Sequence, residues 1–396
     1  MGMLLKFLWK KEHVQGCTTP CNSSSTTIDD LDDNLLCQIL TRVPAKSIAQ
    51  LKVMNKQWNS LISNPFFIVN HALHQSYRNA SGLFHNAPCP GSIVHFSFDL
   101  SSPTVGNQTL SLGLPEDHRT NNLRLFAASN GLLFLMTEYY FCKPMYISNP
   151  TTKKSRCIPS PGGGDIFGFG LAVDPTSFPL HNHYKVVGLY GIHDCKAYQF
   201  KIFTPEIGCW RDSKETISYK KGRSLYGRLS HSVYFREALH WLTSKGDILA
   251  FDVGKEKSWM IKVPRRYSKI VSSRGWFRFT WFGVVDDRLN LVRVTHDGIL
   301  NWALHDYENK RWEIRRRFNK MWSNDHTKGK LPEPIFYDGE ILVLNLFPVI
   351  RRVRDPVPTH IKNVQIHNLR TGVSVFKFLG VTLPLRNLAL PLRTTL

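Results

Sequence analysis

A loose repeat is the feature that most restricts the fold of this 396-residue chain. In each copy a run of alternating apolar residues ends in a polar turn, and the turns lie near Asp99, Asn149, Thr204, Asp252, Asp306 and Asn368. Successive turns are 50, 55, 48, 54 and 62 residues apart, and Trp210, Trp259 and Trp312 follow three of them. Alternation of this kind predicts short β-strands from about residue 81 onwards.

Further strand signals open with a turn residue, in NGLLFL from Asn130, GDILAF from Gly246, DRLNLV from Asp287 and GEILVL from Gly339. A period near 50 residues with several short strands in each unit is typical of the blades of a kelch-like β-propeller. One blade cannot bury both of its faces, so neighbouring blades must stack and close a ring. We therefore expect six blades, or seven if an irregular stretch hides one. Packed β-sandwiches are the alternative.

The segment before the repeat has a helical period instead. Between Leu31 and Tyr77, apolar residues recur at steps of three and four, and Asp32 and Asp33 suit the start of a helix. Pro44 ends the first helix, and the Asn64-Pro65 pair ends the third. The pattern predicts about four short helices. A private core, a helix-turn-helix and a docking module are the alternatives for such a unit.

The residues of this segment resemble an F-box, in the stretch LDDNLLCQILTRVPAKSIAQLKVMNKQWNSLISNPFF. Arg42-Val43-Pro44 stands where the family has Arg-Leu-Pro, and Lys56-Gln57-Trp58 matches Lys-x-Trp. Asp32 replaces the usual first Pro, and Met54-Asn55 replaces Val-Cys. Replacing that Pro leaves an acceptable helix start.

The later residues resemble the F-box-associated domain of plant F-box proteins, in SNGLLFL, YISNPTTKK, GFGLAVDPTSFP, YKVVGLYG and ALHWLTSKGDILAFDV. The two resemblances imply the substrate receptor of a Skp–cullin–F-box ubiquitin ligase, a subunit with no catalysis, metal or cofactor of its own. We expect a disordered segment at 1–27, an F-box helical domain at 28–80 and a propeller at 81–396.

The resemblance further implies that the helical module docks on a Skp-type adaptor and, through it, on a cullin scaffold. Helix-in-groove docking uses apolar side chains at helical spacing. The residues that we expect at this contact are Leu31, Leu35, Ile39, Leu40, Val43, Pro44, Ile48, Leu51 and Trp58. The alternative is that they form only an internal core.

The net charge is +21, with an isoelectric point near 9.7, and its densest run extends from Lys255 to Arg278. Aromatic and arginine side chains are good interface anchors, and arginine pairs well with carboxylates and phosphates. We therefore expect an acidic or phosphorylated target protein on loop residues of the propeller: Arg223, Tyr226, Arg265, Arg266, Trp276 and Arg351. A nucleic-acid-binding or membrane-surface protein and a carbohydrate-binding propeller are the alternative functions.

Motifs that would indicate phosphate binding, metal binding or catalysis are weak in this sequence. GGGDIFGFG lacks the Gly-Lys-Ser/Thr of a phosphate loop, and His181, His183, His193, Asp194 and Cys195 fit a loop better than a metal site. The eight cysteines form no disulfide framework, and no apolar run is long enough to cross a membrane. We expect a chain with free thiols in the cytoplasm, the nucleus or both, and nucleic acid is not the expected partner.

Overall fold

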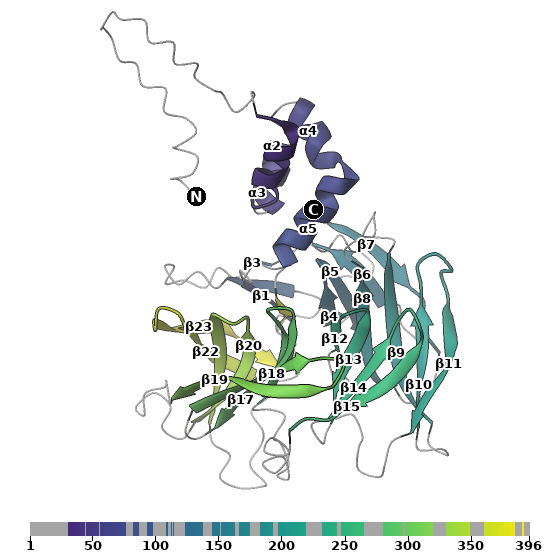
Figure 1. The fold of residues 1–396 in the computed structure, drawn as a ribbon, viewed down its shortest axis with the longest axis vertical. Helices are drawn as coiled ribbons and strands as arrows, with labels where there is room; N and C mark the ends of the chain where they lie inside the picture. The colour runs from purple at the N-terminus through teal and green to yellow at the C-terminus, as the bar shows by residue number, and fades with distance from the viewer. Residues whose placement is uncertain are drawn as a thin grey trace, which may run out of the picture.

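The computed structural model contains a small group of α-helices followed by four-stranded β-sheets arranged as a propeller (Figure 1). The predicted order of a helical module and a mainly-β propeller is therefore confirmed. The predicted disordered segment 1–27 lies outside the part of the chain that the structure describes.

The structure describes residues 31–43, 45–54, 56–76, 82–86, 93–97, 108–109, 112, 114, 123–137, 145–150, 152–162, 166–174, 183–192, 197–218, 232–243, 247–264, 280–295, 298–319, 330–348, 360–384 and 390–391.

The helices of this part are short and lie where the sequence predicted them. They are α2 (Asp33–Leu40), α3 (Ala45–Leu51), α4 (Lys56–Ser63) and α5 (Pro65–Ser76). The Asn64-Pro65 pair ends α4 and starts α5, because the Asn64 side-chain oxygen accepts a hydrogen bond from the Phe66 backbone N–H at 2.8 Å. Proline is also well suited to the first position of a helix, where its missing N–H costs nothing.

Five sheets are each made of four consecutive strands joined by antiparallel pairing. The first has β4 (Leu123–Ser129), β5 (Leu132–Thr137), β6 (Met145–Asn149) and β7 (Lys154–Ile158), and the second β8 (Ile166–Val173), β9 (Tyr184–Ile192), β10 (Ala197–Phe203) and β11 (Trp210–Ser218). The third has β12 (Ser232–Phe235), β13 (Ala238–Leu242), β14 (Ile248–Asp252) and β15 (Lys257–Ile261). The fourth has β16 (Thr280–Val285), β17 (Arg288–Thr295), β18 (Gly298–Asp306) and β19 (Arg311–Asn319), and the fifth β20 (Lys330–Tyr337), β21 (Ile341–Pro348), β22 (His360–Asn368) and β23 (Ser374–Pro384).

A further four-stranded sheet combines both ends of the β domain, in the order β24 (Leu390–Pro391), β1 (Gly82–Asn86), β2 (Ile93–Ser97) and β3 (Gln108–Thr109). The innermost strands contact in order, β4 with β8, β8 with β12, β12 with β16 and β16 with β20. The composite sheet contacts β4 on one side and β23 on the other. Five blades are thus built from consecutive strands, fewer than the six or seven such units that the sequence predicted, because the remaining sheet is split between distant segments.

The repeated polar turns are the links between the third and fourth strands. Asn149, Asp252, Asp306 and Asn368 each accept hydrogen bonds through a side-chain oxygen from backbone N–H groups two or three residues later, at 2.7–3.2 Å. Asn and Asp favour turns because a side chain can close the turn in this way. The repeat therefore comes from the same turn chemistry in four of the sheets. The turn near Asp99 lies outside the described residues.

These turns define two rims of the propeller. The turn rim carries the hairpins between first and second strands, such as Asn130–Gly131 and Asp286–Asp287, and those between third and fourth strands. The connector rim carries the opposite strand ends, such as Ser218, Ile261 and Thr280, where the links from sheet to sheet begin and end. Antiparallel pairing fixes this alternation, since each strand returns to the rim that the previous one left.

The core lies between successive sheets, as a propeller requires. One cluster joins β4–β7 to β8–β11 through Phe134 and Phe169, and the next joins β8–β11 to β12–β15 through Phe200 and Trp241. The repeated Trp residues also connect sheets by hydrogen bonds. The Trp210 indole N–H donates to the Pro159 carbonyl at 2.7 Å, and that of Trp312 to the Lys262 carbonyl at 3.0 Å. Each acceptor directly follows the last strand of the preceding sheet.

Replacing Trp312 with Phe should lower the free energy of unfolding by about 1 kcal/mol, because the ring still packs but the inter-sheet hydrogen bond is lost. Denaturant unfolding of the two chains measures the difference. Trp312→Ala is the comparison, since it also removes the packing and should cost more. Equal stability of the Phe variant and the original chain would show that the hydrogen bond does not hold the sheets together.

Candidate functional site

Helix α2 presents apolar side chains on two sides. Leu36 and Leu40 are buried, whereas Leu35 and Ile39 are 45% and 44% exposed. The helix starts at Asp32, whose backbone carbonyl accepts a hydrogen bond from the Leu36 N–H at 2.9 Å. Residues four apart lie on one face of a helix, so Leu35 and Ile39 form an apolar stripe that the rest of the module leaves uncovered.

The module has its own small core. Leu40, Ile48, Ile62 and Phe67 form it, and five partly buried side chains pack against it: Cys37, Val43, Leu51, Trp58 and Leu61. Burial, with smaller effects of the Asp33 and Asp32 carboxylates, raises the pKa of the Cys37 thiol. The thiol therefore stays protonated at neutral pH and behaves as a small apolar side chain.

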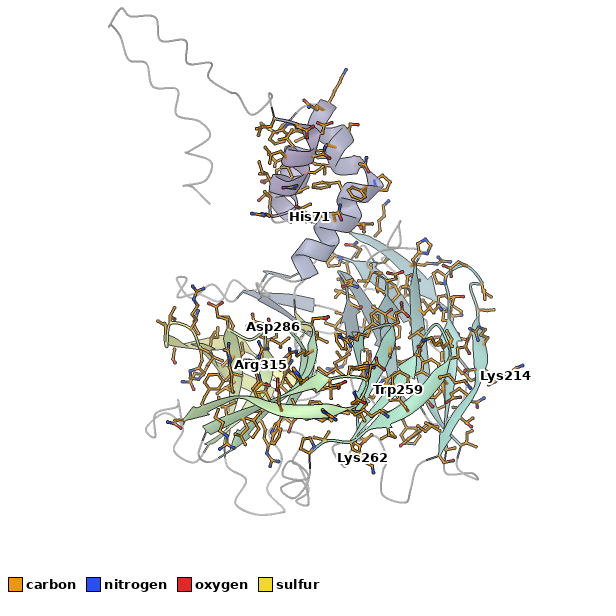
Figure 2. The ribbon with its side chains drawn as sticks, viewed as in Figure 1. His71, Lys214, Trp259, Lys262, Asp286 and Arg315 are labelled. Carbon is orange, nitrogen blue, oxygen red and sulfur yellow. The ribbon has the colours of Figure 1, made fainter. Side chains whose placement is uncertain are left out.

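Two further contacts hold the helices in place. The buried His71 ring on α5 lies with Nε2 2.8 Å from the Val43 carbonyl, in the link between α2 and α3 (Figure 2). The Gln57 side-chain amide donates to the Asp33 carboxylate at 3.4 Å, which joins the start of α4 to the start of α2. The exposed residues of the module thus stand on a scaffold with a defined shape.

Apolar exposure gathers in this module. Of the seven large hydrophobic side chains that are exposed in the described part of the chain, five belong to it: Leu35, Ile39, Val53, Met54 and Phe66. Val53 and Met54 follow α3 and are 85% and 69% exposed, and Phe66 in the first turn of α5 is 72% exposed. A concentration of this kind marks a surface that a partner covers.

The nine residues predicted for adaptor contact divide into groups. Leu35 and Ile39 are exposed and Leu31 is half-buried, so these three are open to a partner. Leu40 and Ile48 are buried inside the module. Val43, Leu51 and Trp58 are partly buried against its core, and Pro44 lies outside the described residues. The alternative of an internal core therefore describes some of the nine and not others.

Sequence reasoning missed Val53, Met54 and Phe66 as exposed residues. The available signal was local: Val53 and Met54 stand just past the last helical turn of α3, and Phe66 follows the Pro that opens α5. The six predicted target-binding residues, Arg223, Tyr226, Arg265, Arg266, Trp276 and Arg351, all lie outside the described residues.

Two family models match the chain. The F-box domain matches residues 28–70, and the F-box associated beta propeller domain matches residues 90–347. The chain belongs to the F-box proteins with a C-terminal F-box-associated propeller. The helical module with the exposed apolar stripe is its F-box, and the sheets from β4 to β20 lie inside the propeller match.

Relatives of this F-box protein occur in Arabidopsis thaliana. The F-box protein At5g07610 is 29% identical over 61% of this chain and 59% of its own length. The putative F-box/kelch-repeat protein At1g20940 is 26% identical over 82% of this chain and 78% of its own. The match to the first relative thus spans less than two thirds of that protein. It places the present chain among plant F-box proteins.

In the described part of this F-box protein, no helix is long and apolar enough to span a membrane, and no group of three or more His, Cys, Asp or Glu side chains could hold a metal ion. Of the histidines weighed for a metal site, His183 is described, and its ring nitrogen Nδ1 lies 4.0 Å from the Glu206 carboxylate at the surface.

Proposed function

We propose that this chain is the substrate receptor of a Skp–cullin–F-box ubiquitin ligase. The observation that carries the proposal is the apolar surface on the F-box, where five large side chains stand exposed on a module with its own core. Burying a Leu, Ile, Met or Phe side chain contributes about 1.5–3 kcal/mol, so a partner that covers several of them binds firmly. A Skp-type adaptor is the partner that the F-box family supports.

The contact would be direct for the open residues and indirect for the buried ones. Leu31, Leu35 and Ile39 would enter the apolar groove of the adaptor, and Val53, Met54 and Phe66 would extend the contact. Leu40 and Ile48 would act by holding the helices together. Val43, Pro44, Leu51 and Trp58 remain proposed contacts with the adaptor.

The propeller would hold the target protein. The links that contain Arg223, Tyr226, Arg265, Arg266, Trp276 and Arg351 join strands whose described ends lie at the connector rim, between β11 and β12, between β15 and β16 and between β21 and β22. Loops at one rim of a rigid ring are a common place for binding residues. We keep these six as proposed target contacts.

The reaction itself would take place elsewhere in the complex. A receptor contributes by holding a target lysine near a ubiquitin-charged enzyme, which turns an encounter in solution into a reaction within one assembly. The role needs no catalytic side chain, and a cullin scaffold bound through the adaptor would set the distance between the two. We propose 28–80 and 81–396 as the limits of the docking and target-binding domains.

We also propose that the composite sheet closes the ring as a sixth blade. Its β24 pairs with β1 through Leu390 with Phe84 and Pro391 with Leu83, so the two ends of the domain would be fastened in one sheet. Contacts with β4 and β23 support this place in the ring.

Co-expression with a tagged Skp-type adaptor tests the receptor function. The proposal expects the full chain to elute with the adaptor as a complex of one copy each from a sizing column, and the isolated chain to bind an environment-sensitive apolar dye that the complex excludes. A folded chain that elutes without the adaptor, at concentrations where other F-box proteins bind it, would overturn the proposal.

A further inference from the structure

Acidic residues of the propeller gather at the turn rim. Those in or beside its turns are Asp174, Glu206, Glu237, Asp252, Glu256, Asp286, Asp287, Asp306, Glu308, Asp338 and Glu340. Several close the turns themselves: the Asp338 carboxylate, for example, accepts backbone hydrogen bonds from Glu340 at 2.9 Å and from Ile341 at 2.6 Å. Turn chemistry therefore explains why these carboxylates stand at one rim.

Basic side chains pair with many of these carboxylates. Arg315 forms a salt bridge with Asp286, and both residues are labelled in Figure 2. Arg211 forms a salt bridge with Glu256 of the next sheet. Arg236 lies 3.9 Å from Asp287, and Lys255 lies 3.8 Å from Asp252. The turn rim thus balances much of its own charge, and the net charge of +21 must be carried by other parts of the chain.

The connector rim differs from the turn rim, where ten basic residues in or beside the turns nearly match the eleven acidic ones: Lys153, Lys154, Arg211, Arg236, Lys255, Lys257, Arg288, Lys310, Arg311 and Arg370. Within the last three strand residues at this rim, or just beyond them, the described basic residues are Arg124, Arg156, Lys262, Arg293, Arg317, Lys330 and Lys362, and the one acidic residue described there is Asp247. Of these, Arg293 is buried. Lys262 and Arg317 are exposed. The sequences that link β11 to β12 and β15 to β16, at 219–231 and 265–279, contain nine Lys and Arg and no Asp or Glu.

The F-box helices join the propeller at the other rim. Helix α5 precedes β1, the second strand of its sheet, and second strands begin at the turn rim. In Figure 2, His71 of the F-box lies above the propeller, whereas Lys262 lies near its lower edge. A partner on the connector rim and an adaptor on the F-box can therefore be bound at the same time.

We propose that the connector rim binds an acidic segment of the target polypeptide. The inference rests on the proposed receptor function, which requires a protein target, and adds the chemical class of the segment that is recognised. Carboxylates form charge-assisted hydrogen bonds with Arg and Lys, and a rim of one sign attracts them from a distance. At the turn rim the basic side chains already face carboxylates of the chain itself, so the net attraction for the same segment is weaker there.

Binding of a fluorescent poly-glutamate peptide to the full chain, in complex with its adaptor, tests the inference. Reversing two charges at the connector rim, Lys262→Glu with Arg317→Glu, should weaken binding about tenfold. The Lys262 replacement keeps the backbone carbonyl that accepts the Trp312 hydrogen bond. The control reverses two exposed charges at the turn rim, Lys153→Glu with Arg370→Glu, and should change affinity less than about twofold.

The outcomes separate the alternatives. Peptide binding that weakens steeply with salt and fails in the connector-rim variant alone supports the inference. The inference is overturned if the peptide does not bind, or if both variants lose the same affinity for it. A competition experiment compares unlabelled peptide with single-stranded DNA of equal charge. If the DNA displaces the fluorescent peptide at a lower concentration than the unlabelled peptide does, the inference is wrong and the rim is assigned to nucleic acid. Adaptor co-elution is recorded for each variant, so a failure of the receptor function is seen independently of peptide binding.

Discussion

Replacing Leu35 with Glu and Ile39 with Lys should weaken adaptor binding by at least about 100-fold and leave the fold intact. The two side chains are almost half exposed in the free chain, so their removal costs the F-box little. In a complex the exposed half of each side chain would be buried, and losing the two contacts removes about 1.5–3 kcal/mol, where 1.4 kcal/mol is a factor of about ten in affinity. Burying charged groups there adds to the loss.

The chosen pair suits the helix as well as the experiment. Glu at position 35 and Lys at position 39 are four apart in the favourable order, and each has the sign that the nearer helix end prefers. Calorimetric binding to the adaptor and thermal unfolding of the free chain are the two measurements. An unchanged affinity would exclude this stripe from the adaptor contact.

Leu40→Ala is the matched comparison from the buried side of the same helix. Leu40 is 3% exposed and packs with Ile48, Ile62 and Phe67. Its truncation should lower the stability of the F-box by about 2–5 kcal/mol. Both variants lose adaptor binding, but only Leu40→Ala does so by loosening the module, and unfolding experiments separate the two causes.

The contrast between these leucines shows what the sequence of the F-box could predict. Helical spacing and the family pattern were sufficient to locate the helices. On α2, however, Leu35 with Ile39 and Leu36 with Leu40 are both spaced by four, so periodicity offers two adjacent apolar faces. Which face is covered depends on α3, α4 and α5, whose packing is a tertiary property.

The propeller was predictable where local chemistry repeats. Asn149, Asp252, Asp306 and Asn368 marked four turns because the same side-chain-to-backbone bonds close them. The Arg236–Glu237 turn between β12 and β13 carried no such signal: both residues have positive φ, at 47° and 59°, although neither is a usual residue for that conformation. Arg236 lies over the Tyr307 ring of the next sheet, 5.4 Å from its centre, so tertiary contacts hold this turn in place.

How the ring closes could not be predicted from the sequence, for a different reason. The composite sheet pairs Leu83 with Pro391, residues at opposite ends of the β domain, and no local pattern joins them. The net positive charge was likewise interpreted from the sequence only as a surface for binding. Part of that charge is structural, since Arg156 donates to the Pro205 carbonyl of the next sheet at 2.8 Å and Arg316 to the Gly339 carbonyl at 2.7 Å.

Mild acid should destabilise the propeller through two buried histidines, His240 and His367. Burial lowers the pKa of each from 6.5 to about 4. In the unfolded chain both take up a proton as the pH falls below 6.5, whereas in the folded chain they stay neutral down to about pH 4. Stability is therefore greatest above pH 6.5 and declines between these two values, because the unfolded state binds more protons.

The expected loss between pH 7.5 and pH 5 is about 2 kcal/mol for each histidine, or about 4 kcal/mol together. The structure explains why the rings stay neutral. His240 lies between the Val233 carbonyl, 3.3 Å from Nδ1, and the Tyr307 hydroxyl, 2.7 Å from Nε2, and His367 Nδ1 lies 2.7 Å from the Ser374 hydroxyl. Neither ring has a carboxylate among these partners to stabilise a positive charge.

Denaturant unfolding at a series of pH values measures the effect. His240→Gln should reduce the loss between pH 7.5 and pH 5 by about half, and His240→Gln with His367→Gln should remove most of it, even if both variants are less stable at pH 7.5. A wild-type stability that stays constant over this range, or an acid loss that persists in the double variant, would mean that other groups control the response. The two histidines join different strands to their surroundings, His240 on β13 to the fourth sheet and His367 on β22 to β23, so their contributions should add.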